Sequence, residues 1–313
     1  MSRTPWIWIG MAVLGASLWL SGVAMAQGNF EIQVYGSETV EPGTTMFEVH
    51  SNLAIKGTTT KEDGIFPTQH AGHETIEITH GFTPWFETGF YIFTSIQPDA
   101  GWKWVGDHIR PRIRVPESWQ VPIGLSLSLE VGYQQRAFST DTWTLELRPI
   151  LDKQWGPFYA SLNPVFDRNL KGEGVHRGFE FSPNAKISYE LTPTISGGLE
   201  YYGGIGPVTA FDPLRRQQQL LFPVLDLNLG PQWECNFGVG FGLTPATDRL
   251  LVKLIVGYRL ALGLGGHRGY EPCSGRVMLG TCGEGLLRRR GSTHLRDITR
   301  GHALTSQGFL PRL

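Results

Sequence analysis

Twelve segments of this 313-residue chain alternate apolar with polar residues at every second position. The segments are 47–55, 73–80, 85–95, 104–115, 125–133, 143–151, 157–167, 179–189, 195–203, 218–229, 233–243 and 250–260. A period of two is typical of β-strands, and about ten residues is the length that a tilted transmembrane strand needs. Strands of soluble sandwiches are usually shorter. The pattern therefore predicts an all-β fold, an antiparallel transmembrane β-barrel of about 12 strands.

The connections between these segments alternate in length. Those after the even-numbered segments are short, and four of the five contain a tryptophan, namely Trp85, Trp119, Trp155 and Trp233. Those after the odd-numbered segments are mostly longer and more polar, as in 57–72. Short periplasmic turns, longer external loops and interfacial aromatic residues are features of outer-membrane barrels. An even number of strands would place both ends of the barrel on the periplasmic side.

Residues 107–116, D-H-I-R-P-R-I-R-V-P, indicate which face of the predicted barrel wall lines a polar lumen. Arg110, Arg112 and Arg114 occupy alternate positions, with apolar residues between them. An arginine that faces lipid at the middle of a membrane costs about 2 to 4 kcal/mol. The three guanidinium groups are therefore expected in a polar lumen, and the hydrocarbon side chains outside.

Carboxylates on neighbouring segments are candidate partners for these arginines, because opposite charges on adjacent strands can pair across one face. The predicted lumen or constriction residues are Arg110, Arg112, Arg114, Arg148, Glu77, Glu87, Glu130 and Glu146. Two interpretations stay open. The cluster is either an internal salt-bridge network that fills the barrel and fixes its register, or a constriction whose basic and acidic walls select solutes.

Five prolines lie within the predicted strands, all on the outward face: Pro111, Pro149, Pro164, Pro183 and Pro223. Each proline removes a backbone N–H donor from the hydrogen bonds between strands, and a carbonyl without a partner is energetically unfavourable in lipid. We expect a bulge or kink at each site. A kink that opens a lateral gap in the wall is the alternative.

The first 26 residues have the features of a secretory signal. Arg3 is a short basic region, residues 6–20 form an apolar run, and Ala24-Met25-Ala26 is a small-x-small cleavage site. Residues 1–26 are therefore predicted to be a cleaved signal peptide, with an uncleaved anchor as the alternative.

The remaining boundaries follow from the alternation. Residues 27–45 are expected to form an N-terminal periplasmic segment or to fold inward, and residues 46–260 to form the outer-membrane barrel. Residues 261–313 have no period of either kind. We expect a disordered tail there, or an aberrant one produced by a change of reading frame.

Signals of catalysis or cofactor binding are weak. The chain lacks the G-x-S-x-G motif, and His70 and His73 have no further ligands at a suitable spacing, so a polar loop is favoured over a metal contact. The three cysteines form no disulfide framework, and a net charge of −1 gives no nucleic-acid footprint. We therefore expect no enzyme, catalytic residue, cofactor or metal. A lipid hydrolase is disfavoured by the missing nucleophile.

Several phrases resemble one bacterial family. They are 36–39 (GSET), 74–87 (ETIEITHGFTPWFE), 106–112 (GDHIRPR), 145–150 (LELRPI) and 211–215 (FDPLR). They are similar to the outer-membrane transporter family filed under a meta-pathway of phenol degradation, over about residues 30–260. The resemblance implies a Gram-negative outer-membrane barrel that passes small solutes, aromatic or hydrophobic ones among them. It carries over no catalytic residue.

Residues 253–260, K-L-I-V-G-Y-R-L, resemble the terminal strand that the barrel-assembly machinery reads, although leucine stands where that pattern prefers an aromatic residue. The expected partners are this machinery, outer-membrane lipid and a small-molecule solute. The leading functional hypothesis is passive uptake of small solutes by a porin-like channel in the bacterial outer membrane. The alternative is a plugged structural or adhesive barrel that acts through its external loops.

Overall fold

The computed structural model describes residues 30–261 of the chain. The signal peptide predicted for 1–26 lies outside these residues, as does the tail predicted for 261–313 apart from Ala261. Within the described part, no helix is long and apolar enough to cross a membrane. Its two helical elements, η1 (Glu117–Trp119) and η2 (Glu173–Arg177), are short 3-10 turns in connections between strands.

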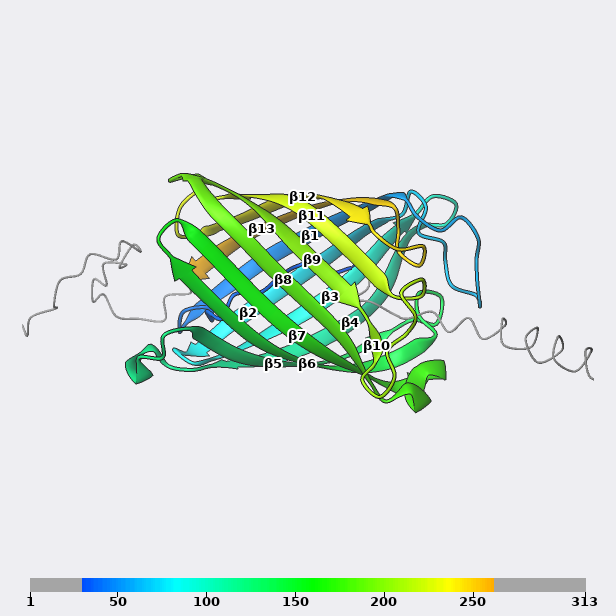
Figure 1. Cartoon of the computed structure of the whole chain (residues 1–313), viewed down its shortest axis with the longest axis horizontal. Helices are drawn as coiled ribbons and strands as arrows, with labels where there is room; N and C mark the ends of the chain where they lie inside the picture. Colours follow the sequence, from blue (N-terminus) through cyan, green and yellow to red (C-terminus); the bar gives the residue numbers. More distant parts are fainter. Residues whose placement is uncertain (1–29, 262–313) are drawn as a thin grey trace, which may run out of the picture. The chain divides into compact units, whose positions relative to one another are not determined.

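The described strands form one closed antiparallel β-barrel, which confirms the fold predicted from the alternation (Figure 1). The wall consists of β1 (Thr44–Lys56), β2 (Gly72–Thr83), β3 (Phe86–Gln97), β4 (Gly101–Arg114), β5 (Gly124–Gln134), β6 (Asp141–Trp155), β7 (Phe158–Gly172), β8 (Phe179–Thr192), β9 (Ile195–Gly204), β11 (Gln218–Leu227), β12 (Trp233–Gly242) and β13 (Leu250–Ala261). Strands β1 and β13 pair with each other, as do β8 and β9, and these pairs close the ring. The short strand β10 (Gly206–Pro207) pairs with β8. Each predicted segment corresponds to one strand of the wall.

The strands place apolar side chains outside and charged ones inside, because successive side chains of a strand point to opposite faces. In β4, Ile109 is 50% exposed whereas Arg110 is 1% exposed. In β1, Phe47 and Val49 are exposed whereas Glu48 between them is buried. An apolar exterior around a polar interior is the arrangement of a membrane-spanning barrel.

Three of the five strand prolines interrupt the strand pairing without shifting its register, whereas Pro164 and Pro183 lie opposite each other in the continuous pairing of β7 with β8. Between β4 and β5 the pairing stops at Ile109 and resumes at Arg112 in the same register, on either side of Pro111. The pairing of β6 with β7 is interrupted in the same way at Pro149, and that of β11 with β12 at Pro223. The register therefore shows no bulge at these three sites, and a kink, the other possibility expected there, stays a prediction. The missing N–H removes bonds locally, while the flanking pairs keep the strands in register.

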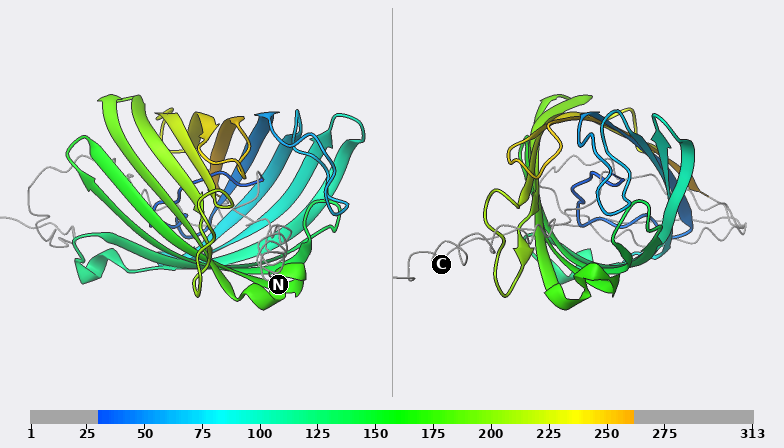
Figure 2. Two further views of the ribbon diagram at one scale, coloured as in Figure 1. Left: turned by 45° about the vertical axis from the view of Figure 1, so that its right-hand side comes forward. Right: turned by 90° about the vertical axis from the view of Figure 1, so that its right-hand side faces the viewer.

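Residues 30–42, which precede β1, lie inside the barrel. Figure 2 shows this part of the chain, in dark blue, within the ring of strands. The carbonyl oxygen of Phe30 accepts a hydrogen bond from Thr75 Oγ1 at 2.7 Å, and the N–H of Gly43 donates to the carbonyl of Gly81 at 2.8 Å. Residues 30–42 are called the lumen segment below. Of the two arrangements that the sequence left open, the structure has the inward-folded one.

Apolar contacts pack the lumen segment against the wall on two sides. Ile32 and Val34 join buried residues of β9, β11 and β13, with Phe222 among them. Phe30 packs with buried residues of β3 and β4, including Phe93. Burying one such side chain contributes about 1.5 to 3 kcal/mol. The lumen segment is therefore a packed part of the fold.

Replacing Ile109, on the outward face of β4, by arginine tests the orientation of the wall. We expect Ile109→Arg to lower the free energy of unfolding by about 2 to 4 kcal/mol, because the guanidinium group would face hydrocarbon. Urea unfolding of the barrel in lipid vesicles measures the change. The control is Val208→Arg, at an exposed position in a connection, which should change this free energy by less than about 0.5 kcal/mol. Equal effects of the two substitutions would contradict a lipid-facing exterior.

Candidate functional site

Arg110 and Arg112 of β4 pair with one carboxylate each from β2 and β3. Gly89 lies directly opposite Arg110, and a Cβ there would come within 3.4 Å of Arg110 Nη2, so the glycine leaves room for the guanidinium group. Arg110 Nη2 donates to Glu77 Oε1 at 2.7 Å, and Arg112 Nη2 lies 2.7 Å from Glu87 Oε1. All four charged side chains are buried. Because a buried charge is costly unless it is paired, the four residues form one compensated cluster.

Tyr35 of the lumen segment lies among three guanidinium groups. The Cζ atoms of Arg110, Arg148 and Arg112 are 4.3, 4.9 and 5.6 Å from the centroid of its ring. The Tyr35 hydroxyl donates a hydrogen bond to Glu31. A cation within about 6 Å of an aromatic ring is attracted by the electron-rich face of the ring. One aromatic side chain therefore separates and stabilises three like charges.

Side chains of the wall also bind the backbone of the lumen segment. Arg112 donates to the carbonyl oxygens of Gly36 and Glu38, at 3.2 and 2.6 Å. Glu87 Oε2 accepts the N–H of Val40 at 2.6 Å. The residues that neutralise each other's charge thus also hold the lumen segment in place.

The other predicted residues of the lumen form two further pairs. Glu146 accepts two bonds from Arg148, at 2.6 Å from Nε and 2.8 Å from Nη2, which is the strong bidentate geometry. Glu130 binds Nδ1 of His108, a partner that the sequence did not indicate. Because Arg148 contacts the ring of Tyr35, these residues belong to the same region of the lumen as Arg110.

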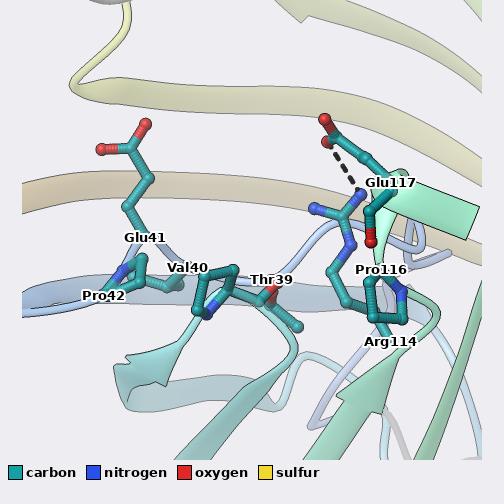
Figure 3. Close-up of a pocket in the computed structure, with 9 residues that line it drawn as sticks. Thr39, Val40, Glu41, Pro42, Arg114, Pro116 and Glu117 are labelled. Atoms are coloured by element: carbon teal, nitrogen blue, oxygen red, sulfur yellow. Dashed lines mark hydrogen bonds and ion pairs between the residues drawn. The ribbon is translucent and has the colours of Figure 1, made fainter.

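Arg114 lies away from this cluster, at the short-turn end of the barrel. Its guanidinium group pairs with Glu117 at 3.1 Å, and the Glu117 side chain is 83% exposed. Both residues line a pocket of about 330 Å³ next to residues 39–42 (Figure 3). The structure therefore brings the other predicted residues into the interior and places Arg114 at the mouth. Their action as a constriction stays a prediction.

Glu31 is a buried carboxyl of the lumen segment. Burial and the nearby carboxylate of Glu130 raise the pKa of Glu31 from 4.5 to about 7, although the charges of Arg148 and Arg110 act in the opposite direction. The group therefore keeps its proton more readily in the docked lumen segment than in an unfolded chain. Protonation of Glu31 is thus coupled to docking.

The histidines that the sequence offered as metal ligands have separate surroundings. The Nε2 atom of His70 lies 2.8 Å from Gln69 Nε2, whereas the ring of His73 packs edge-on against Phe30 with centroids 4.5 Å apart. Neither contact brings a second ligand-bearing group to the pair.

No family model matches the chain, and no curated protein matches it. Three solved structures illustrate what it is similar to. An outer-membrane channel from Pseudomonas putida F1 is 10% identical with a TM-score of 0.49, and the match covers 74% of this chain and 100% of that one. The KdgM porin in complex with disordered oligogalacturonate is 11% identical with a TM-score of 0.42, covering 69% and 98%. The NanC porin is 6% identical with a TM-score of 0.42, covering 67% and 97%. Likeness at this level carries no argument about function, which is inferred below from the site itself.

Replacing Arg110 tests whether the buried charges depend on each other. We expect Arg110→Met to lower the free energy of unfolding by about 3 to 5 kcal/mol, because the buried carboxylate of Glu77 would lose its partner. Urea unfolding in lipid vesicles gives the change. Arg114→Met is the matched control, since Arg114 pairs with an exposed carboxylate and should cost at most about 1 kcal/mol. If the two substitutions cost the same, the lumen cluster is not a desolvated ionic network.

The raised pKa of Glu31 predicts a pH dependence of stability. The folded protein binds a proton at Glu31 more tightly than the unfolded chain does, so the contribution of Glu31 is fully present below pH 4.5 and is lost as the pH rises through about 7. We expect the difference in unfolding free energy between the wild type and Glu31→Gln to change across this window and to be level above it. Unfolding curves of both proteins at several pH values measure the difference. A constant difference would show that Glu31 does not titrate with folding.

Proposed function

We propose that this protein is a bacterial outer-membrane channel for the passive passage of small solutes, and that aromatic solutes are among them. The observation that carries the proposal is the position of Tyr35, an aromatic ring held by three guanidinium groups inside a closed barrel with an apolar exterior. Tyr35 thus marks a place in the lumen where an aromatic ring is bound by contacts that a solute with such a ring could also make.

The contacts of Tyr35 indicate what an incoming solute would meet. The lumen segment is not part of the sheet where it crosses the lumen, and its polar contacts with the wall are hydrogen bonds and ion–ring contacts that a solute can replace. Among the described residues, Nε and Nη1 of Arg110 have no hydrogen-bond partner. If Tyr35 moves aside, these donors face the lumen together with the hydroxyl of Tyr91, which now lies 3.1 Å from that of Tyr35. A small ring that carries a carboxylate or hydroxyl group fits such a site.

The resemblance of several sequence phrases to outer-membrane transporters of a phenol-degradation pathway supports the same class of solute. It also supports the location in the outer membrane, where lipid would contact the apolar exterior and the barrel-assembly machinery would insert the chain after export. The constriction of this channel would then be formed by Arg110, Arg112 and Arg148 with their carboxylates.

A plugged structural or adhesive barrel is the second candidate, and the filled lumen favours it. In the structure the lumen segment occupies the interior and is bound to the wall at both ends. A barrel of this kind would act through the loops opposite the short turns. The two candidates differ in whether the lumen segment can be displaced.

Removal of residues 30–40 tests the channel in planar lipid bilayers. We expect the deletion variant to show conductance steps several times larger than those of the intact barrel, because the lumen would lose its packed contents. Arg136→Ala is the control, since Arg136 pairs with Glu173 at an exposed position and should leave the steps unchanged. Absence of steps in both the intact and the deleted barrel would contradict the channel and favour the structural barrel.

The class of solute is tested on the same deletion variant. Benzoate should reduce the ionic current at lower concentration than cyclohexanecarboxylate, which has the same charge and nearly the same size but no aromatic ring. The combination of the deletion with Arg110→Met should remove this difference, because the guanidinium group that stacks on the ring is absent. Equal inhibition by the two acids before that substitution would contradict a preference for aromatic solutes.

A further inference from the structure

Two carboxylates face each other across the first strand pair of the barrel. Glu48 of β1 lies directly opposite Glu77 of β2, and both side chains are buried in the lumen wall. Like charges in directly opposite positions of a sheet destabilise it, and burial strengthens their repulsion because there is less water to screen it. This arrangement needs a positive charge close to both groups.

The arginines of the lumen do not fully meet this need. Arg110 pairs with Glu77 through Oε1 at 2.7 Å, and Arg112 pairs with Glu87. Within residues 30–261, Glu48 forms no ion pair. With all three carboxyl groups ionised, the cluster of Glu48, Glu77, Glu87 and the two arginines is short of one positive charge.

The space around Glu48 is created by a glycine on its other side. Gly257 of β13 lies directly opposite Glu48, and a Cβ at this position would come within 2.9 Å of Glu48 Cγ and 2.6 Å of Met46 Cε. The carboxylate of the next strand, Glu234, is already paired with Arg259 at 3.0 Å. Glu48 is thus accommodated in the wall next to a compensated ion pair, and it has no ion-pair partner of its own within residues 30–261.

His50 completes a set of three potential ligands. It is the next inward-facing residue of β1 after Glu48 and is fully buried, with Nε2 3.3 Å from Glu77 Oε2. One potential ligand atom from each of Glu48, His50 and Glu77 lies within 4.8 Å of the other two. Among the described residues, Glu48 Oε1 and His50 Nδ1 have no hydrogen-bond partner, and His50 Nε2 and Glu77 Oε2 have none apart from their 3.3 Å contact with each other. Buried polar atoms without partners are rare and costly, so such atoms on three neighbouring residues whose potential ligand atoms lie within 4.8 Å of one another indicate a missing ligand.

We propose that Glu48, His50 and Glu77 bind a divalent first-row transition-metal ion of the Zn²⁺ type. One imidazole nitrogen and two carboxylate oxygens form a mixed donor set that suits such an ion better than Mg²⁺ or Ca²⁺, which prefer oxygen alone. Glu77 would bind through Oε2, because Oε1 is held by Arg110. Three protein ligands leave a position for water from the lumen. The inference concerns binding and does not depend on transport.

The main competing explanation is a proton in place of the metal ion, held by one of the facing carboxyl groups or by His50. The two explanations differ in a measurable way. A metal site binds about one ion per barrel, and a protonated cluster binds none. The proteins needed are the full-length barrel, folded in detergent micelles and freed of metal by a chelator, and three variants of it.

The experiment is equilibrium dialysis against Zn²⁺ with metal analysis of the protein, followed by visible absorption spectra with Co²⁺ in its place. We expect one ion per wild-type barrel and a Co²⁺ spectrum of a site with nitrogen and oxygen ligands. Glu48→Gln and His50→Ala should each weaken Zn²⁺ binding more than about tenfold. Substitution of a residue that only supports a metal ligand already weakens binding by about tenfold or more. Glu48→Gln keeps the size of the side chain, so it gives an answer even if His50→Ala does not fold.

His73→Ala is the matched control. His73 is also buried in the lumen wall with both ring nitrogens unpartnered among the described residues, but it packs against Phe30 and belongs to no group of metal-ligand residues. This variant should bind Zn²⁺ like the wild type. The proposal is overturned if the wild type binds no ion, if Glu48→Gln binds as tightly as the wild type, or if His73→Ala loses binding to the same extent as Glu48→Gln.

Discussion

Compensation of charge inside a narrow lumen is the constraint on which this structure depends. An arginine in contact with hydrocarbon is costly, so Arg110, Arg112 and Arg148 face inward, where burial leaves little water to solvate them. Arg110 and Arg112 are therefore stable only because Glu77 and Glu87 lie within bonding distance. The apolar exterior and the ionic interior are consequences of the same alternation of side chains.

The lumen segment extends this compensation from side chains to backbone. Carbonyl oxygens of the segment accept bonds from Arg112, and its Val40 N–H is bound by Glu87. The ring of Tyr35 lies against the guanidinium groups of Arg110 and Arg148, which are also paired with Glu77 and Glu146. A chain segment with no regular structure of its own can thus fill the barrel, because the wall provides the partners that a strand or helix would otherwise supply.

The fold could be predicted from the sequence because strict alternation assigns each residue of a strand to one face of the sheet. Ile109 and Arg110 could be assigned to opposite faces with no knowledge of neighbouring strands. The pairing of charges could not be predicted in this way, because it depends on the register between strands. Glu130, for example, binds His108 and not an arginine. Tyr35 gave no signal at all, since residues 30–42 have no period and take their positions from contacts with the wall. A bulge is one of the two distortions expected at Pro111, and the register shows none there because the flanking strand pairs keep β4 and β5 aligned.

Arg110 links the proposed metal site to the lumen segment. Its guanidinium group binds Glu77 on one side and lies against the ring of Tyr35 on another. A cation bound at Oε2 of Glu77 would withdraw negative charge from the carboxylate and weaken its hold on Arg110. The same cation would repel the guanidinium group, which the ring of Tyr35 can stabilise only in part. Occupation of the site by Glu48, His50 and Glu77 would therefore change the contacts that hold Tyr35, and linkage requires that displacement of Tyr35 in turn change the affinity for the metal.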